Sequence, residues 1–186
     1  LVSHLDLLKN LDAQELTLYR KYKEIQRLNP NPALVKKIEK NLWKPTDITN
    51  KKKTIGEIER LEPVIEFVET GNLDEFNILR VKTSSMEWIT GPGRSVKAII
   101  KDKPTGKYLG ILTLASDFRV LETRDSYIGW SNKQRSTARN HLCNMNTCHS
   151  TQPLGFNFLG GKLVASLATT SIVRDKWFEK YGDTLV

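Results

Sequence analysis

Residues 144–186 read NMNTCHSTQPLGFNFLGGKLVASLATTSIVRDKWFEKYGDTLV, and this stretch decides the predicted fold. A strand-like run over residues 142–147 leads into a loop, Gly160 and Gly161 open a helix, and a second strand is predicted near Thr184. A strand, a glycine-containing turn and a helix N-terminus together present backbone N–H groups that can hold a phosphate. The stretch therefore predicts a nucleotide-like or nucleic-acid ligand.

The residues predicted to cradle a phosphate are the polar and glycine residues of this loop and helix start. They are Gln152, Gly155, Gly160, Gly161 and Lys162. The alternative interpretation is a purely structural turn and helix start, in which glycine only supplies backbone freedom.

The chain has 186 residues, enough for one domain or for one domain with an appendage. Its 39% hydrophobic and 27% charged residues are typical of a globular protein with a core. No apolar run of about 18 residues occurs, which argues against a membrane span, and the start shows no signal-peptide pattern. Cys143 and Cys148 show no disulfide-scaffold pattern, so the chain is expected in the reducing cytoplasm.

The formal net charge of the chain is +8. A basic balance of this size favours a nucleic-acid partner, above all double-stranded DNA, or another anion. A basic surface that has no partner is the alternative. A protein partner or a homo-oligomer is compatible with the same composition.

The first 72 residues are predicted to form a helical appendage, because helix signals alternate with helix breakers there. Asp12 is placed to cap a helix that runs to about Leu28. Prolines then end this helix, and Pro32 begins a second, short one. The appendage is expected to clamp DNA, to bind a partner, or only to pack on the core.

A third helix is predicted from the capping-box pattern of Thr54 and Glu57. Its apolar stripe extends past Pro63, where a kink is expected, and Gly71 ends it. The preceding residues 43–53 are interpreted as a linker with a basic end.

The sequence pattern changes after the appendage, and residues 73–186 are predicted to form an α+β core. Residues 76–81 are strand-like, and residues 95–115 contain two strands around a run of turn residues, which predicts a hairpin. Ser131 and Gln134 form a capping-box pattern for a short helix. Helices, then a hairpin, then strand–loop–helix–strand is an α+β layout.

Three segments of the chain resemble a known family. Residues 106–112 read GKYLGIL, residues 124–135 contain RDSYIGWS and then QR, and residues 180–182 read KYG at the end of the strand–loop–helix part. Together they resemble the DruA family of the Druantia anti-phage system and its phage-borne relatives, over about residues 106–186. The layout is more distantly similar to the Mom protein of phage Mu, a DNA adenine-modifying enzyme of GNAT-like fold.

The resemblance implies a GNAT-like mixed sheet with flanking helices over residues 73–186, preceded by the helical appendage of residues 1–72. Because the chain has no initiating Met and stops inside a predicted strand, trimming at both ends is expected. The resemblance also implies a bacterial or phage-infected cell, a DNA base as substrate, and acetyl-CoA or a related acyl-CoA as donor.

In GNAT proteins a loop and the following helix N-terminus hold the pyrophosphate of acetyl-CoA. Gln152 and Gly155 match the first half of that signature here. Phe156 and Asn157 occupy the place where the signature has a second glycine. Gly160 and Gly161, after an inserted loop, are then expected to take the role of that glycine.

His149 is the first candidate for a general base, since an unperturbed histidine titrates near neutral pH and His149 lies beside the glycine-containing loop. Asp125 and Ser116 are the other catalytic candidates. Ser116 ends the second hairpin strand, where it is expected to line a cleft. Asp125 either acts at the site or forms a structural ion pair with Arg124.

A separate group of side chains is of the types that bind metals. His141, Cys143, Cys148 and His149 place four potential ligands within nine residues. Alternation along a strand splits these side chains between two faces, and their spacing matches no standard zinc motif. No metal site is therefore predicted.

A nucleic-acid surface is predicted from basic and aromatic residues around residues 124–139. An aromatic ring there is suited to base stacking and a guanidinium to a phosphate contact, and the next helix adds a basic strip. The alternatives are a tryptophan packed in the core and a solvated helix face. The predicted contacts are Arg124, Trp130, Lys133, Arg135 and Arg139.

Three hypotheses for function follow. The leading one is a phage- or defence-related protein on an acyltransferase-like scaffold that modifies DNA bases, which must leave the base stack to be reached. The second is a non-catalytic DNA-binding component of a defence or virion assembly. A nuclease or transposase accessory ranks last, because no acidic cluster has the spacing to hold a metal.

Overall fold

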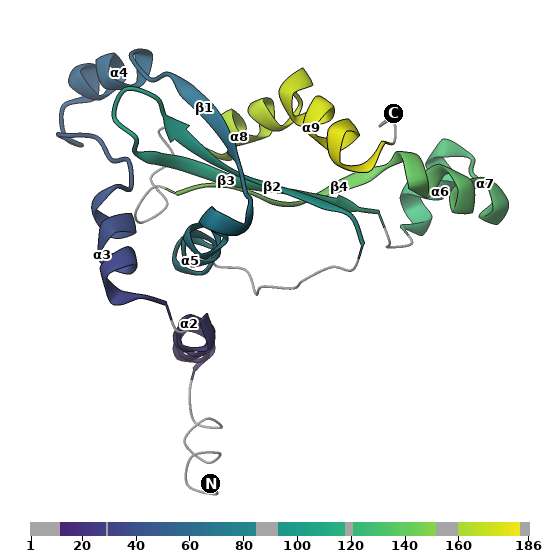
Figure 1. Ribbon diagram of the computed structural model, residues 1–186, viewed down its shortest axis with the longest axis horizontal. Helices are drawn as coiled ribbons and strands as arrows, with labels where there is room; N and C mark the ends of the chain where they lie inside the picture. Colours follow the sequence, from purple (N-terminus) through teal and green to yellow (C-terminus); the bar gives the residue numbers. More distant parts are fainter. Residues whose placement is uncertain (1–11, 29, 85–92, 118–120, 152–159, 183–186) are drawn as a thin grey trace, which may run out of the picture.

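Four antiparallel strands form the one sheet in the described part of the chain, in the order β1-β2-β3-β4 (Figure 1). The strands are β1 (Pro63–Phe67), β2 (Ser95–Asp102), β3 (Tyr108–Ser116) and β4 (Cys143–Ser150). The computed structural model describes residues 12–28, 30–84, 93–117, 121–151 and 160–182. The predicted α+β class is confirmed. Parallel pairing, expected for a mixed sheet, does not occur among these four strands, and the strand predicted near Thr184 lies outside the described residues.

The hairpin of β2 and β3 forms where the sequence predicts it. Its strands pair from Ser95 opposite Ala115 to Lys101 opposite Tyr108. The loop closes through Gly106, whose N–H donates to the Asp102 carbonyl at 2.8 Å and whose φ of +66° suits glycine. β3 is buried along nearly its whole length because the sheet is covered on both faces.

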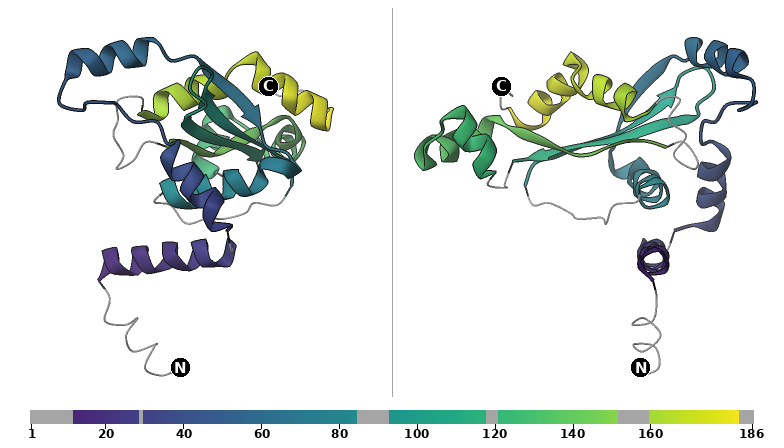
Figure 2. Two further views of the ribbon diagram at one scale, coloured as in Figure 1. Left: turned by 60° about the vertical axis from the view of Figure 1, so that its left-hand side comes forward. Right: turned by 180° about the vertical axis from the view of Figure 1, so that it is seen from behind.

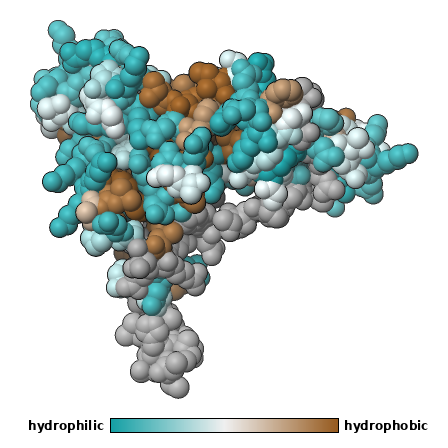
Figure 3. Space-filling model, viewed as in Figure 1, coloured by the Kyte–Doolittle hydropathy of each residue, from teal (hydrophilic) through white to brown (hydrophobic). Residues whose placement is uncertain are grey.

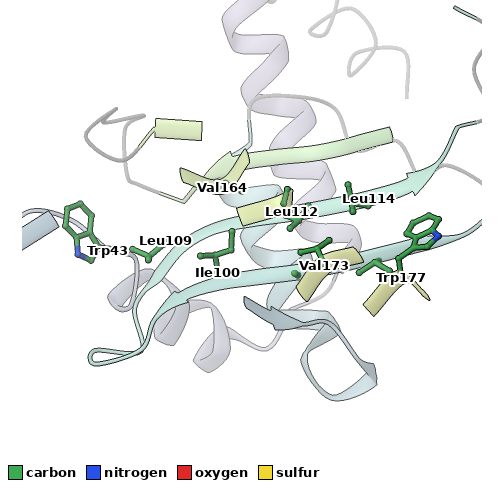
Figure 4. Close-up of a cluster of buried hydrophobic side chains, with 11 residues drawn as sticks. Trp43, Ile100, Leu109, Leu112, Leu114, Val164, Val173 and Trp177 are labelled. Carbon is green, nitrogen blue, oxygen red and sulfur yellow. The ribbon is translucent and has the colours of Figure 1, made fainter. Parts of the chain in front are cut away.

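Helices cover the two faces of the sheet unequally. On one face lie α8 (Gly160–Ala168) and α9 (Ser171–Tyr181); on the other lies α5 (Leu73–Thr83), as Figures 1 and 2 show. Side chains from β3, α8 and α9 meet in the larger hydrophobic cluster, which includes Leu109, Leu112, Val164, Val173 and Trp177 (Figure 4). A second cluster lies between α5 and the opposite face of the sheet.

The first two N-terminal helices begin where the sequence predicts, one after its cap Asp12 and the other at Pro32. The Asp12 carboxylate accepts hydrogen bonds from the N–H groups of residues 14 and 15 at 2.7 and 2.8 Å, and α2 (Ala13–Leu28) follows. α3 (Pro32–Lys40) has a proline at its start and buries Ile38. Both helices contact α5, and α2 projects farthest from the sheet (Figure 2).

The predicted third helix is wrong beyond residue 59. α4 (Lys51–Glu59) is capped by Asn50, whose side chain accepts from the Lys53 N–H, and Thr54 lies inside the helix rather than at its cap. Pro63 begins β1 instead of kinking a helix. A proline is tolerated at the start of an edge strand, where its missing N–H breaks no ladder hydrogen bond. The sheet therefore takes one strand from the segment predicted as appendage.

Residues 41–43 also join the core instead of opening a linker. Leu42 forms a parallel bridge with Tyr108, the Tyr108 N–H donates to the Asn41 carbonyl at 2.8 Å, and the Trp43 N–H donates to the Tyr108 carbonyl at 3.0 Å. Trp43 is buried in the larger hydrophobic cluster. The chain thus reaches the sheet well before the first strand.

The strand predicted over residues 76–81 is wrong, because these residues lie in α5. Phe76, Ile78, Leu79, Arg80 and Val81 are all buried there. A short continuous apolar run fits a buried helix as well as a buried strand, so periodicity alone does not separate the two.

Two short helices form a lobe beyond the end of the sheet (Figure 1). α6 (Glu122–Ile128) is not predicted from the sequence, whereas α7 (Asn132–Ala138) is. At its start, the Ser131 N–H donates to the Gln134 side chain at 2.9 Å and the Gln134 N–H donates to the Ser131 hydroxyl at 3.3 Å. These reciprocal bonds are the predicted capping box.

A close approach between β3 and α8 depends on Gly110. A Cβ atom placed there would lie 2.3 Å from Cγ2 of Val164 and 3.1 Å from the His149 carbonyl oxygen. Val164 is fully buried and β-branched, so its side chain has little freedom to move away. Only glycine lets the helix pack this close to the strand.

We expect Gly110→Ala to lower the free energy of unfolding by about 1–3 kcal/mol, as overpacking does. Chemical denaturation measures this change. In the Gly110→Ala/Val164→Ala double variant the loss should be smaller than the sum of the two single losses. Gly56→Ala in α4 is the control, because no atom lies within 4 Å of that added Cβ and alanine favours a helix interior. Additive losses would contradict the close-approach explanation.

In the part of the chain that the structure describes, no helix combines the length and the apolar character that a membrane crossing requires.

Candidate functional site

A buried cluster of charges joins the end of β3, the start of β4 and both helices of the lobe. The Asp117 carboxylate accepts hydrogen bonds at 2.7 Å from Nη1 of Arg124 and at 2.7 Å from the Asn144 side chain. The Asp125 carboxylate accepts from Nε and Nη2 of Arg124 at 2.9 and 2.8 Å, and from Nη1 of Arg135 at 3.4 Å. Arg124 thus bridges two carboxylates.

The cluster is electrically balanced, with two carboxylates against two guanidinium groups. Burial raises the pKa of Asp125, but hydrogen bonds and charge from Arg124 and Arg135 outweigh it, so the pKa lies below its ordinary value. The hydrogen bond with Asp125, together with Asp117, raises the pKa of Arg124. Asp125 is therefore an ion-pair partner, and the structure favours the structural alternative for this residue over a general base.

The RDSYIGW stretch is one compact local unit. Gly129 ends α6 with a φ of +80°, and the Trp130 N–H donates to the Asp125 carbonyl at 2.9 Å. The chain reversal brings the Trp130 ring under the Arg124 guanidinium, 5.8 Å from its centre. Trp130 is partly exposed and does not belong to the hydrophobic core.

The predicted nucleic-acid residues do not share one role. Arg124 and Arg135 both pair with Asp125, so their charges are largely compensated. Lys133 is exposed and has no ion pair in the described part of the chain. Arg139 follows α7 in a short 3-10 turn, Arg139–His141, and is not on the same helix as Arg135.

Ser116 lies near the charge cluster but serves the backbone. Its hydroxyl accepts from the Arg94 N–H at 3.0 Å and from the Arg94 side chain at 3.4 Å. The Arg94 guanidinium also donates to the Asn140 carbonyl at 2.8 Å and lies 5.2 Å from the Trp177 ring centre. These contacts tie the start of β2 to the end of β3, the lobe and α9.

His149 lies at the other end of β4, with the start of α8. It pairs with Ile111, whereas Asn144 pairs with Ala115, so about 16 Å of strand separates the two positions. Nδ1 of His149 is 3.1 Å from the Ser150 carbonyl oxygen. The structure therefore does not bring the three catalytic candidates together.

The start of α8 meets β4 at Cys148, whose sulfur lies 3.9 Å from the Gly161 carbonyl oxygen. Gly161 and Lys162 are exposed at this end. Gln152 and Gly155, the other predicted phosphate ligands, lie outside the described residues. Burial raises the pKa of the Cys148 thiol, and also of Cys143, which disfavours a reactive thiolate at either position.

Metal ligands do not converge in the described ranges. No three His, Cys, Asp or Glu side chains there are grouped to hold an ion.

Sequence reasoning missed Asn144, and it expected Asp117 only to line a cleft beside Ser116, not to form an ion pair with Arg124. The available signal was an acidic residue directly after an apolar strand, which is unusual at a buried position unless a cation pairs with it. Nothing local indicates that Asn144, 27 residues away, supplies a second hydrogen bond.

Comparison with known proteins gives a family match that covers most of the chain. The family model described as "Druantia protein DruA" matches residues 12–186. This chain belongs to the DruA family. The curated Druantia protein DruA from Escherichia coli (strain UMEA 4076-1) is 30% identical over 129 residues, which cover 68% of this chain and 31% of that protein. The chain thus spans about a third of the length of its relative.

The predicted membership in a family of anti-phage defence proteins is confirmed, and the match begins at residue 12 instead of residue 106. No solved structure matches this chain. The matching region includes α2 to α4, so the N-terminal helices belong to the family pattern.

We expect Asp125→Asn to make stability less dependent on acid pH. The pKa of Asp125 is lower in the folded protein than the ordinary Asp pKa of about 3.9, so its ionised carboxylate stabilises the fold above that pH. This stabilisation is lost as the pH falls through the lower pKa of the folded state. The variant should have a lower Tm than the parent at pH 7, with a smaller difference near pH 2. Thermal unfolding between pH 7 and pH 2 tests this.

Asp175→Asn is the matched control. Arg174 and Asp175 form the same adjacent Arg–Asp pair with the same two guanidinium hydrogen bonds, but the Asp175 side chain is 65% exposed. We expect little change in Tm from this variant at any pH, because exposed pairs contribute little. Equal behaviour of the two variants would contradict a structural role for the buried cluster.

Proposed function

We propose that this chain is a DNA-contacting part of an anti-phage defence protein and that it holds duplex DNA by its phosphates. The observation that carries the proposal is the lysine run Lys51, Lys52 and Lys53. All three side chains are exposed in the first turn of α4, which contains no acidic residue. Lys51 and Lys52 have no ion pair within the described ranges, whereas Lys53 lies near the carboxylates of Asp47 and Glu57.

This arrangement is unfavourable without a ligand. The N-terminus of a helix carries a partial positive charge, and a cation beside it costs about 0.3–1 kcal/mol at low salt. Three adjacent lysines also repel one another. Phosphates relieve both penalties, and neutralising them releases counterions, which favours binding.

Two further basic residues lie on the surface beside α4, together with the exposed Glu59 and Glu62. The Lys103 N–H donates to the Glu62 carbonyl at 2.9 Å, which fixes the hairpin loop beside the chain that leaves α4. Lys103 and Arg60 are exposed there, and hydrophilic residues cover α4 in Figure 3. A stretch of backbone phosphates is the ligand that best suits several separate cations on one surface.

The lysines of α3 provide a contrast. Lys37 and Lys40 lie in the last turn of that helix, where the helix dipole favours a cation. Their placement is explained by helix stability alone, whereas the placement of Lys51 and Lys52 in α4 is not.

We expect replacement of all three α4 lysines by glutamine to weaken binding of a 20-base-pair duplex uniformly across sequences. Each lost phosphate contact should reduce the slope of log K against log salt by about 0.9, so the slope falls by about 2–3 in magnitude. Fluorescence anisotropy over a range of salt concentrations measures it. The control replaces Lys36, Lys37 and Lys40 of α3, which removes the same charge. Equal losses in both variants would show that net charge, and not the α4 surface, drives binding.

A second candidate function, acyl transfer to a DNA base on a GNAT-like scaffold, has one observation in its favour. The N-terminus of α8 lies at the end of β4, with Gly161 exposed and His149 close by in the sequence. Among the described residues outside its own helix, a Cβ at Gly161 would have only the Cys148 carbonyl oxygen nearby, at 3.9 Å, which leaves room for an anionic group. Gly161 and Lys162 would hold the phosphates of an acyl-CoA, which supplies an activated acyl group.

Heat stability distinguishes this candidate from simple DNA binding. If α8 holds a donor, acetyl-CoA should raise the Tm of the parent, and Gly161→Asp should abolish the rise because a carboxylate repels phosphates. An unchanged Tm in the parent would remove acyl-CoA as the ligand without affecting the proposed DNA contact.

A further inference from the structure

The charges of α4 are placed against the dipole of the helix at both of its ends. The lysines at 51–53 lie in the first turn, and the last turn contains Glu57 and Glu59 but no basic residue. The N-terminal end of a helix disfavours cations, and the C-terminal end disfavours anions. Phosphate ligands would account for the lysines, but they would be repelled by an exposed glutamate, so the acidic end of α4 needs another explanation.

Glu57 has a role within the chain, whereas Glu59 has none in the part that the structure describes. The Glu57 carboxylate accepts a hydrogen bond from the Thr46 N–H at 2.9 Å. Glu59 is exposed and forms no ion pair with any described residue. Its carboxylate therefore lies at the unfavourable end of the helix dipole without compensation from the described fold.

Gly56 is a second feature of α4 that the fold of one chain does not require. It lies in the interior of the helix, where glycine is less favourable than alanine. No atom lies within 4 Å of a Cβ added at this position, so the chain leaves room for a side chain there. Gly110 is the opposite case, because Val164 excludes a Cβ from it. A helical glycine with open space beside it is suited to the close approach of another molecule.

One face of α4 carries a stripe of residues that are three or four positions apart, as neighbours on a helix surface are. They are Lys52, Ile55, Gly56 and Glu59. All four line the same open hollow at the surface, and the Ile55 side chain is 44% exposed there. The opposite face of α4 packs on the fold through Thr54 and Ile58. Because α4 lies at a corner of the molecule, where β1 begins (Figure 1), the stripe is accessible to a partner.

We infer that α4 packs antiparallel against α4 of a second copy of this chain. In a two-fold pairing centred between Ile55 and Gly56, Lys52 of each copy lies opposite Glu59 of the other, because both positions are equally far from the centre. Each lysine then lies beside the C-terminal end of the other helix, and each glutamate beside its N-terminal end, where the dipole favours it. The two isoleucines meet, and the two glycines leave no side chain between the backbones.

The stripe selects a second copy because it is complementary to itself. A two-fold contact brings the same surface of both copies together, so it needs a cation and an anion on opposite sides of its centre. Lys52 and Glu59 meet this requirement, whereas a parallel pairing would place like charges opposite each other. The net charge of +8 opposes association only at long range, since the screening length is about 8 Å at physiological salt.

The contact is small, so the dimer is expected to be weak. A helix of nine residues is only about 13 Å long, and such a contact buries less than the roughly 1,200 Å² of a stable interface. Sedimentation velocity over a concentration series, at physiological salt and without DNA, measures the association. The parent protein should change from monomer to dimer as its concentration rises. A monomer over the whole series would overturn the inference.

Charge reversal tests the antiparallel register. Lys52→Glu and Glu59→Lys should each weaken self-association about tenfold, because each turns two attractions of the symmetric pair into two repulsions. An equimolar mixture of the two variants should regain the dimer, since opposite charges then meet at both positions. Lys37→Glu on α3 makes the same change in net charge and should associate as the parent does. A mixture that stays monomeric, or equal weakening by Lys37→Glu, would overturn the inference.

Gly56→Gln tests the close approach and leaves the fold intact. Glutamine is the better helix former, and the space beside Gly56 is open, so the Tm should be equal to that of the parent or higher. The long side chain separates the two backbones, and the variant should remain monomeric. A dimer of parental affinity in this variant would overturn the inference.

A further variant separates this inference from the proposed DNA contact, on which it does not depend. The Lys51→Gln/Lys53→Gln protein retains Lys52 and Glu59, so it should self-associate as the parent does while its affinity for duplex DNA falls. Normal self-association with unchanged duplex affinity would contradict the proposed function and leave the pairing standing. Loss of self-association in this variant would overturn the pairing.

Discussion

The burial of β3 is the constraint on which the rest of the structure depends. β3 pairs with β2 on one side and with β4 on the other, and residues from its two faces enter both hydrophobic clusters. Gly110 allows α8 to pack directly on it, and the strand delivers Asp117 into the charge cluster where it ends. Each layer therefore takes its position from this one strand, whose polar backbone is satisfied by two neighbours.

In the charge cluster, the buried carboxylate of Asp117 connects the end of β3 to α6 and β4. Asp117 is acceptable in a buried position only because Arg124 and Asn144 satisfy its oxygens, and Arg124 in turn fixes Asp125 and the ring of Trp130. The arginine and aspartate of the family-like RDSYIGW stretch thus hold the α6–α7 lobe on the sheet. Their type and spacing resemble those of a reactive site, but their geometry is that of a structural joint.

The basic character of the chain is spread unevenly over its surface. Arg124, Arg135 and Lys101 are balanced by carboxylates, whereas Lys51 and Lys52 in the first turn of α4 have no ion pair within the described ranges. Cations without an ion pair favour the binding of a polyanion, because the bound polyanion reduces the repulsion between the cations and releases its counterions. The arrangement of the charge, more than its sum, is the basis of the proposed DNA contact.

Local signals in the sequence determined the caps of α2 and α7, the proline at the start of α3, the β2–β3 hairpin and the start of α8, because each depends on residues a few positions apart. The tertiary structure alone decided that residues 63–67 form a strand and residues 76–81 a helix, since a short apolar run is buried equally well in either form. It also decided that His149 lies far from Asp125, and that Asp117 meets Asn144 while Lys180 meets Ser95. These pairs are remote in sequence, and only strand register and helix packing bring them together.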